Sequence, residues 1–301
     1  MGAQFSQFFP PRPTFTISDV PSQQGKVIIV TGAASGIGQE LVRVLYQKGA
    51  TIYLAGRSEI HAQEAIQSIQ ATTITTTAGH LHYLSLHLDD LTTIKSTPPL
   101  GSVSAQGIEL QIATNCLGPF LLTQLLLPFL SAAVSVRSPA PRVIWTSSQV
   151  AELSAPPEGI LLSELRDPPR DAVRNYVTSK LGNWFLSVEF ARRYGGTGLA
   201  SVAQNPGAAN TNLLRNARWM KLLSWPLLHS PAVAANTVLY AAFSEELNQA
   251  VHNGEYVIPW GRIHPGVAPG LAKHLAQEDE GGTGRAREFW EWCMERTRDY
   301  L

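Results

Sequence analysis

The feature that most constrains this chain is a cluster of glycines between a buried strand and a helix. Residues 27–30 form a continuous apolar run, typical of a strand buried on both faces of a parallel sheet. The segment Thr31-Gly-Ala-Ala-Ser-Gly-Ile-Gly38 follows, and apolar residues then recur at helical spacing until Gly49. Glycines at this place let the backbone approach a pyrophosphate at a helix N-terminus. The pattern therefore predicts a dinucleotide-binding βαβ unit, and favours it over a glycine-rich turn without a ligand.

Further strands and helices alternate along the rest of the chain. The expected elements are strands at 51–55, 81–88, 142–146, 198–204 and 256–259, and helices at 59–70, 105–127, 171–194 and 232–247. This order predicts an α/β fold with a doubly wound, Rossmann-like parallel sheet in three αβα layers. We find no linker, so we expect an N-terminal arm at 1–24 and one cofactor-binding and catalytic domain at 25–301, with residues from about 207 to 301 on the substrate side.

Charge and cysteine content exclude several classes of function. Lys+Arg and Asp+Glu both number 23, so the formal net charge is zero and nothing favours electrostatic capture of nucleic acid. Cys116 and Cys293 form no Cys-x-x-Cys pair, which argues against a zinc site or a disulfide framework. We find no pattern of a secretory signal in the first residues. The most hydrophobic run, Leu117 to Leu130, is shorter than the roughly 20 residues of a membrane-spanning helix. We expect a cytoplasmic protein without a transmembrane span.

The N-terminus matches the loose N-myristoylation pattern, with Gly2 as acceptor and Ser6 at the favoured position. That would give a weak membrane association through Gly2. So short a pattern often occurs by chance, and we favour the alternative of a disordered arm, rich in Phe and Pro, that extends through Phe15.

Tyr176 and Lys180 stand four residues apart in a predicted helix, so their side chains share one face. A free phenol titrates near pH 10, and a neighbouring ammonium stabilises its anion. The pair predicts an acid/base tyrosine whose pKa Lys180 lowers. Alone, the spacing fits two partly exposed neighbours equally well. It gains weight from the strand at 142–146, which is followed by Ser147 and Ser148.

The glycine spacing, the Tyr-x-x-x-Lys pair and the strand-end serines together resemble the short-chain dehydrogenase/reductase family, over Gly25 to about Leu247. The resemblance implies catalytic roles for Tyr176 and Lys180, a substrate hydrogen bond from Ser148, and a proton-relay water held by Asn115. A turn-forming serine and a satisfied helix-side amide are the alternatives. It also implies that cofactor contacts come from Gly32, Ser35, Gly36, Ile37, Gly38, Asn115, Tyr176, Lys180, Pro206, Gly207, Ala209 and Thr211.

The end of the second strand bears on cofactor choice. An acid there accepts hydrogen bonds from the ribose hydroxyls of NAD, whereas Arg57 can pair with the 2′-phosphate of NADP. NADP(H) is favoured over the alternative of a solvated surface arginine. The chain also resembles the retinol-dehydrogenase-like branch found in fungi, including its Tyr256-Val-Ile-Pro-Trp-Gly261 segment. That implies a lipophilic ketone or alcohol substrate of secondary metabolism.

Two departures weaken the resemblance. Where the family carries an aspartate that meets adenine after the third strand, an ungapped match places His87; Leu88 and Asp89 follow, and Asp89 compensates after a small shift. His80, His82 and His87 lie close together, but without a Cys or carboxylate at ligand spacing we predict no metal.

The second departure is larger, because the interval from Asp89 to Ser104 is too short. A helix of about 11 residues, a strand of about 5 and loops of about 4 each do not fit there. We expect one central βα unit to be missing, with about 20 residues carrying an Asn-Ala-Gly-like turn lost near Lys95 to Pro99. The leading hypothesis is an NADP(H)-dependent oxidoreductase acting on a small carbonyl or alcohol. The alternative is a catalytically impaired chain, or the product of a faulty gene model, that acts at most as a binding protein.

Overall fold

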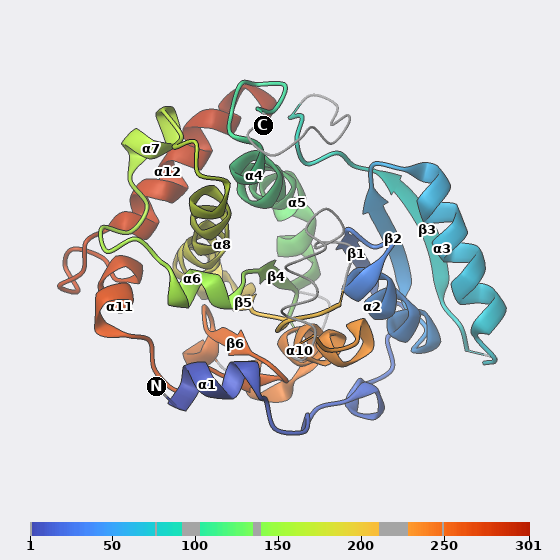
Figure 1. Cartoon of the computed structure of the whole chain (residues 1–301). Coiled ribbons are helices and arrows are strands. Elements are labelled where there is room, and N and C mark those ends of the chain that lie inside the picture. The colour runs from blue at the N-terminus through green and yellow to red at the C-terminus, as the bar shows by residue number, and fades with distance from the viewer. Residues whose placement is uncertain (1, 76, 92–102, 135–139, 211–227, 249) are drawn as a thin grey trace. The chain divides into compact units, whose positions relative to one another are not determined.

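The computed structural model describes residues 2–75, 77–91, 103–134, 140–210, 228–248 and 250–301 (Figure 1). The chain forms two compact units, each assembled from segments that are distant in sequence. Unit 1 comprises Met1–Leu86, Pro206–Ser244 and Pro259–Arg262, and unit 2 comprises His87–Asn205, Glu245–Ile258 and Ile263–Leu301. Each unit has its own apolar core.

The sheet of unit 1 is parallel, with strand order β1-β2-β3. Its strands are β1 (Val27–Thr31), β2 (Thr51–Gly56) and β3 (His80–Ser85). Its main helices are α2 (Gly36–Gln47), α3 (Glu59–Thr72) and α10 (Pro231–Phe243), and α10 packs on α2. Apolar faces of these elements meet in a core that includes Val42, Leu45, Ile52, Leu54 and Leu239.

The second sheet has the order β4-β5-β6-β7, with β4, β5 and β6 parallel. Its strands are β4 (Arg142–Thr146), β5 (Ala200–Gln204), β6 (Tyr256–Ile258) and β7 (Arg262–Ile263). The main helices of unit 2 are α5 (Gly118–Val134), α8 (Ala172–Tyr194) and α12 (Arg285–Thr297). α12 packs along α8, and Trp290 of α12 meets Phe120 of α5 edge to face at 4.8 Å between ring centroids.

Short helices complete both units. Unit 1 contains α1 (Gly2–Phe8) and η1 (Ile17–Asp19). Those of unit 2 are α4 (Leu110–Ile112), the π-helical η2 (Ala113–Leu117), α6 (Gln149–Leu153), α7 (Leu162–Arg166), η3 (Gly195–Thr197), η6 (Glu245–Asn248), η7 (Ala250–His252), α11 (Pro269–Leu275) and η8 (Arg298–Tyr300).

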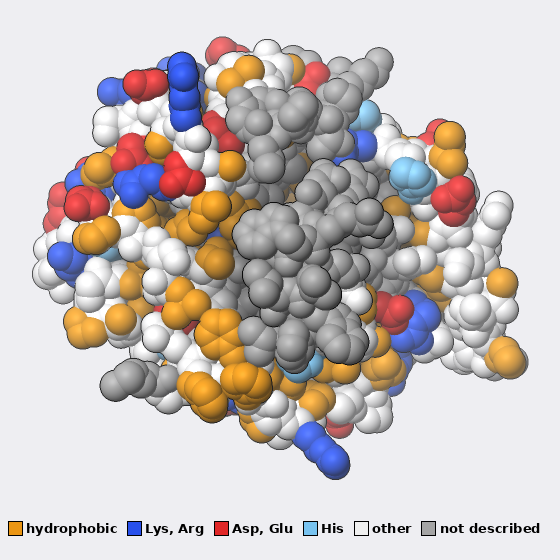
Figure 2. All heavy atoms as spheres, viewed as in Figure 1, with side chains coloured by type: hydrophobic (Ala, Val, Ile, Leu, Met, Phe, Trp, Pro, Cys, Tyr) orange, Lys and Arg blue, Asp and Glu red, His pale blue; other side chains and the backbone are white. Residues whose placement is uncertain are grey.

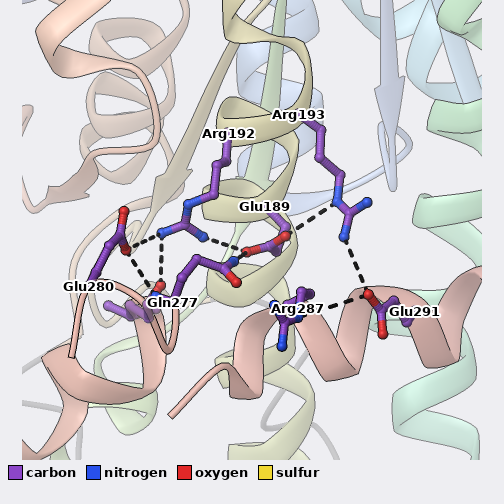
Figure 3. A network of polar contacts seen from close by, with 8 residues as sticks. Glu189, Arg192, Arg193, Gln277, Glu280, Arg287 and Glu291 are labelled. Atoms are coloured by element: carbon purple, nitrogen blue, oxygen red, sulfur yellow. Dashed lines mark hydrogen bonds and ion pairs between the residues drawn. The ribbon is translucent and has the colours of Figure 1, made fainter. Parts of the chain in front are cut away.

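A buried carboxylate holds the C-terminal segment of the chain against α8 (Figure 3). The side chain of Glu189 is 1% exposed, pairs with Arg192 and Arg193, and accepts a hydrogen bond of 2.6 Å from Gln277. Arg192 reaches Glu280 at 3.2 Å as well. Because the burial of a charge is costly unless it is paired, this network fixes the end of α8 to the segment after α11.

The expected α/β class with parallel strands is confirmed. The described residues contain no strand between β3 and β4, and among them β1 pairs only with β2 and β4 only with β5. The proposed insertion point at Lys95 to Pro99 lies outside the described residues. Within the described residues, β1 and β4 each have a partner strand on one side only.

Two expectations about helices are wrong. The helix expected at 105–127 extends instead from Leu110 to Val134. It does not begin before Leu110, because the side chains of Ser104 and Glu109 accept hydrogen bonds from the backbone amides of Ile108 and Ile112. By length and composition this 25-residue stretch is able to cross a membrane, although Leu117 and Phe120 are buried in the core of unit 2, as in a core helix.

The N-terminal arm, expected to be disordered, includes helix α1. Arg262 donates a hydrogen bond of 2.8 Å to the carbonyl of Ser6, and Gln7 is 2% exposed. Phe5 on this helix and Phe9 directly after it remain exposed, and Figure 2 shows apolar side chains gathered along the lower edge of the view, where α1 lies in Figure 1. The guanidinium of Arg262 thus anchors the N-terminal arm within unit 1.

Candidate active site

Helix α8 carries the tyrosine and the lysine of the candidate site in unit 2. Asp171 caps the helix by accepting hydrogen bonds from the amides of Val173 and Arg174. Tyr176 and Lys180 then lie one turn apart, with the Lys180 ammonium 5.6 Å from the centroid of the Tyr176 ring. The sequence prediction that the two side chains share a face describes this arrangement well.

The two serines after β4 play different parts. The hydroxyl of Ser147 donates 2.8 Å to the carbonyl of Lys180 and so ties the strand end to α8. Ser148 is the N-cap residue of α6 but makes no capping bond with its side chain. Its hydroxyl instead hydrogen-bonds the phenol of Tyr176. The structure thus brings Ser148, and not Ser147, to the phenol.

Asn115 lies in the π-helical turn η2 that leads into α5. Its amide donates 2.9 Å to the hydroxyl of Ser179, which in turn donates 2.8 Å to the carbonyl of Tyr176. A π-helical turn inside an α-helix is frequent at functional sites because it re-aims one side chain. Here it links Asn115 to the backbone of the tyrosine through Ser179.

Burial sets the pKa values of the two titratable groups. It raises the pKa of Tyr176 above that of a free phenol, and the hydrogen bond with Ser148 only partly opposes this. Burial also lowers the pKa of Lys180 to about 8. The expectation that Lys180 lowers the pKa of Tyr176 is wrong for this state, because the ammonium donates to the Thr146 carbonyl at 3.2 Å and desolvation dominates.

The glycine-rich turn of unit 1 has the backbone geometry that its sequence predicts. Gly32 and Gly36 adopt positive φ values of 65° and 58°, and Ser35 is the N-cap residue of α2. A Cβ atom on Gly38 would lie 2.4 Å from the carbonyl oxygen of Gly32, so the turn closes tightly onto the start of the helix. The first turn of α2, which includes Ile37, holds no acidic residue. This cradle fits an anionic pyrophosphate.

Other predicted cofactor residues of unit 1 lie at strand or loop positions. Arg57 directly follows β2 and is exposed. Gly207 has a φ of 79° after Pro206, and Ala209 forms a bridge with His229. Thr211 lies outside the described residues.

The segment after β3 belongs to unit 2. His87 and Leu88 are half-buried, whereas Asp89 is 6% exposed and its Oδ1 atom has no partner among the described residues. A Cβ atom on Gly118 would lie 2.4 Å from the carbonyl oxygen of Leu88, so α5 starts against this loop. A buried carboxylate oxygen without a partner is consistent with a ligand contact, and Asp89 suits that role better than His87.

Sequence analysis missed Ser179, Asn183 and Tyr256. Asn183 donates 2.8 Å to the Thr146 carbonyl that also binds Lys180, and Tyr256 donates 3.1 Å to the carbonyl of Ser148. The position of Ser179 beside Lys180 carries no signal. Asn183 lies one turn after Ser179 on α8. Its polar side chain within a buried helix is a detectable signal in the sequence, because such a side chain needs a hydrogen-bond partner.

The comparisons place this fold in a known class. Residues 26–97 match the family described as short chain dehydrogenase. A short-chain dehydrogenase/reductase of Pestalotiopsis fici is 42% identical over 96% of this chain and 95% of its own length. A short-chain dehydrogenase/reductase of Phomopsis amygdali is 39% identical over 99% of this chain and 97% of its own length. A crystal structure of an uncharacterized protein of Mycobacterium paratuberculosis has a TM-score of 0.68, 27% identity, and coverage of 94% of this chain and 97% of its own.

The family match and these relatives identify an oxidoreductase of a class that acts on small molecules. The chain belongs to the short-chain dehydrogenase/reductase family.

The same alignments show that this chain is internally short. The alignment with the Pestalotiopsis fici protein extends over 316 positions, yet 96% of 301 residues is about 289, which leaves about 27 positions without a counterpart here. For the Phomopsis amygdali protein, 99% of 301 is about 298 of 327 positions, which leaves about 29. The family match ends at residue 97, inside the interval where the sequence predicts a lost segment.

Proposed function

We propose that this chain is an NADP(H)-dependent oxidoreductase that interconverts a ketone and an alcohol of a lipophilic small molecule, in the cytoplasm, as a step of fungal secondary metabolism. The observation that carries the proposal is the convergence of Ser148, Tyr176 and Lys180 at one place in unit 2. The fungal relatives support the setting. Because hydride and proton must reach one carbonyl group, the proposal assigns residues 25–301 to one catalytic domain, with 207–301 on the substrate side.

In this proposal each residue acts on one atom. The Ser148 hydroxyl orients the substrate oxygen, and the Tyr176 phenol donates its proton to that oxygen during reduction and accepts it during oxidation. Burial keeps the phenol protonated, which favours reduction at neutral pH. Lys180 holds ribose hydroxyls, and Asn115 supports a water that returns the proton. The bound nicotinamide supplies the hydride.

The residues of unit 1 form the cofactor side of the proposal. The Gly32–Gly38 turn takes the pyrophosphate, and Arg57 pairs with the 2′-phosphate. Pro206, Gly207, Ala209 and Thr211 are assigned to the nicotinamide, and His87, Leu88 and Asp89 to the adenine.

The test is a titration of the purified chain with NADPH, followed by the fluorescence of its 7 tryptophans. Saturable binding, together with NADPH consumption in the presence of an aromatic ketone, is the expected result. Binding without consumption of NADPH favours the second candidate, a non-catalytic binding protein; the alignment positions that are missing from this chain also favour that candidate. Absence of NADPH binding would contradict both functions.

The charge of Lys180 predicts a pH dependence of cofactor affinity. Its ammonium is present below pH 8 and lost above, so the affinity for NADPH is expected to fall about tenfold as pH rises through about 8. Lys180→Arg keeps the charge and should remove this fall. Between about 8 and 10.5 the free energy of unfolding should rise with pH, because only the unfolded chain still binds the proton. The same pH dependence of the NADPH dissociation constant in the arginine variant would contradict the role of Lys180.

Arg57→Asp is expected to shift the preference for NADPH over NADH by about tenfold or more toward NADH. The new carboxylate repels a 2′-phosphate and accepts hydrogen bonds from ribose hydroxyls. Dissociation constants for both cofactors measure the ratio. Arg12→Asp, an equal change of charge at another exposed arginine of unit 1, is the control. If both variants move the ratio equally, Arg57 acts only through net charge.

A further inference from the structure

The short helix α6, which starts directly after Ser148, is held at both ends by residues from the end of the chain. At its start, the hydroxyl of Tyr256 donates 3.1 Å to the carbonyl oxygen of Ser148. At its other end, Nε2 of His264 lies 3.1 Å from a carboxylate oxygen of Glu152. Tyr256 of β6 and His264, which directly follows β7, are themselves joined by a backbone hydrogen bond of 2.8 Å. The segment from β6 to His264 therefore contacts α6 at two places.

The side chain of Tyr256 is held in one place as a hydrogen-bond donor. Its side chain is 2% exposed and stacks on Trp184 of α8, with 3.8 Å between ring centroids and an interplanar angle of 17°. Burial raises the pKa of Tyr256 well above that of a free phenol, so the hydroxyl stays neutral and keeps its proton. The neighbouring Ser147 hydroxyl donates to the carbonyl of Lys180. Tyr256 and Ser147 thus hold the end of β4 and the start of α6 beside the helix that carries Tyr176.

The grip at Glu152 has a defined direction. Nδ1 of His264 accepts a hydrogen bond of 3.2 Å from the amide of Gly266, so this nitrogen carries no proton. The proton of a neutral imidazole then sits on Nε2, which donates to Glu152. Both side chains are buried, at 2% and 3% exposure, and water does not compete for this bond. The end of α6 is fixed without a charged imidazole.

We infer that Tyr256 is a positioning residue that sets the placement of the Ser148 hydroxyl against Tyr176, and that the His264–Glu152 pair steadies the same helix. The inference rests on the proposed function, since it assumes that Ser148 orients the substrate oxygen. Tyr256 acts on the reaction only through Ser148, which distinguishes it from a residue that merely stabilises the fold.

A double-mutant cycle tests this dependence with NADPH and an aromatic ketone as probes. Tyr256→Phe keeps the ring stacked on Trp184 and removes only the hydroxyl. It should lower kcat about tenfold with an unchanged dissociation constant for NADPH. In a Ser148→Ala background the same change should have less than about a twofold effect on kcat. Equal effects in both backgrounds overturn the inference. Tyr194→Phe, which removes a phenol bonded to Gln124 elsewhere on α8, is the matched control and should leave kcat unchanged.

Two further variants address the second contact. Glu152→Ala should lower kcat several-fold, whereas Glu152→Gln should retain it, because an amide oxygen still accepts from a neutral His264. Loss of kcat in both variants contradicts the neutral donor.

Amide hydrogen exchange separates this inference from the proposed function, because it needs no turnover. Residues 149–153 should exchange about tenfold faster in Tyr256→Phe than in the parent chain, while 176–190 keep their rates. Unchanged exchange in 149–153 overturns the positioning role even if the chain proves active. Faster exchange in a chain without turnover upholds the grip on α6 and places the failure in the proposed function.

Discussion

Tyr176→Phe is expected to lower kcat by about 10²–10⁴ while the affinity for NADPH stays within a few-fold. The phenol of Tyr176 is the group of the described site whose transferable proton lies beside the side chain of Ser148. The ring itself, which lies beside the ammonium of Lys180, is retained in the variant. NADPH consumption measures the first effect and tryptophan fluorescence the second.

Tyr194→Phe serves again as control, because it removes a phenol from the same helix without touching the serines. Turnover that persists in Tyr176→Phe at the parent rate would remove the tyrosine from the mechanism. Loss of NADPH binding together with turnover would instead indicate that the phenol supports the cofactor or the fold.

Sequence patterns predicted well those parts of the site whose residues are neighbours along the chain. The turn from Gly32 to Gly38 and the step from Tyr176 to Lys180 are local, so their geometry follows from the elements that hold them. The strand end at Ser148 is local too, and the structure separates its role from that of Ser147.

The parts that escaped prediction depend on contacts between distant segments. Tyr256 reaches Ser148 across 108 residues of sequence, and His264 reaches Glu152 across 112. Neither pair leaves a periodic pattern. The direction of the pKa shift of Tyr176 cannot be predicted from sequence for a related reason, because the sequence reveals the charge of a neighbour but not the desolvation that only packing produces.

Among the described residues, the one-sided pairing of β1 and β4 bears on the stability of the chain. β5, which has a strand on each side, has four of its five residues buried, whereas β1 and β4 have one each. Val27 of β1 is 63% exposed. An unpaired ladder group costs about 1–3 kcal/mol when it is buried, and this partial exposure to water lowers that cost. The exposed edges instead offer templates for pairing between chains.

Helix α5 of unit 2 carries large apolar side chains that no other described element covers. Phe129 is 73% and Leu125 48% exposed on this helix, one turn apart. In α/β folds the helices on one face of a sheet pack against each other and cover such residues. The exposed apolar side chains of α5 are therefore what the expected loss of a βα unit would leave.

We therefore expect the chain as written to bind NADPH weakly and to aggregate during expression, and an insert near Lys95 to Pro99 to correct both. The insert to test is the corresponding segment of the Pestalotiopsis fici relative, for which the sequence predicts about 20 residues; about 27 positions of the whole alignment have no counterpart in this chain. Its strand would pair with β1 and β4 and its helix would cover Phe129, so the free energy of unfolding should rise by several kcal/mol, a large share of a typical total of about 5–15 kcal/mol. Denaturant unfolding and NADPH titration of both chains measure the change, and an insert of equal length made of Gly and Ser is the control, because it lengthens the loop without adding a strand. If the transcript carries no such segment and the chain as written unfolds cooperatively and binds NADPH tightly, then the two edges close by another route, and the short interval after Asp89 is a true variation of the fold.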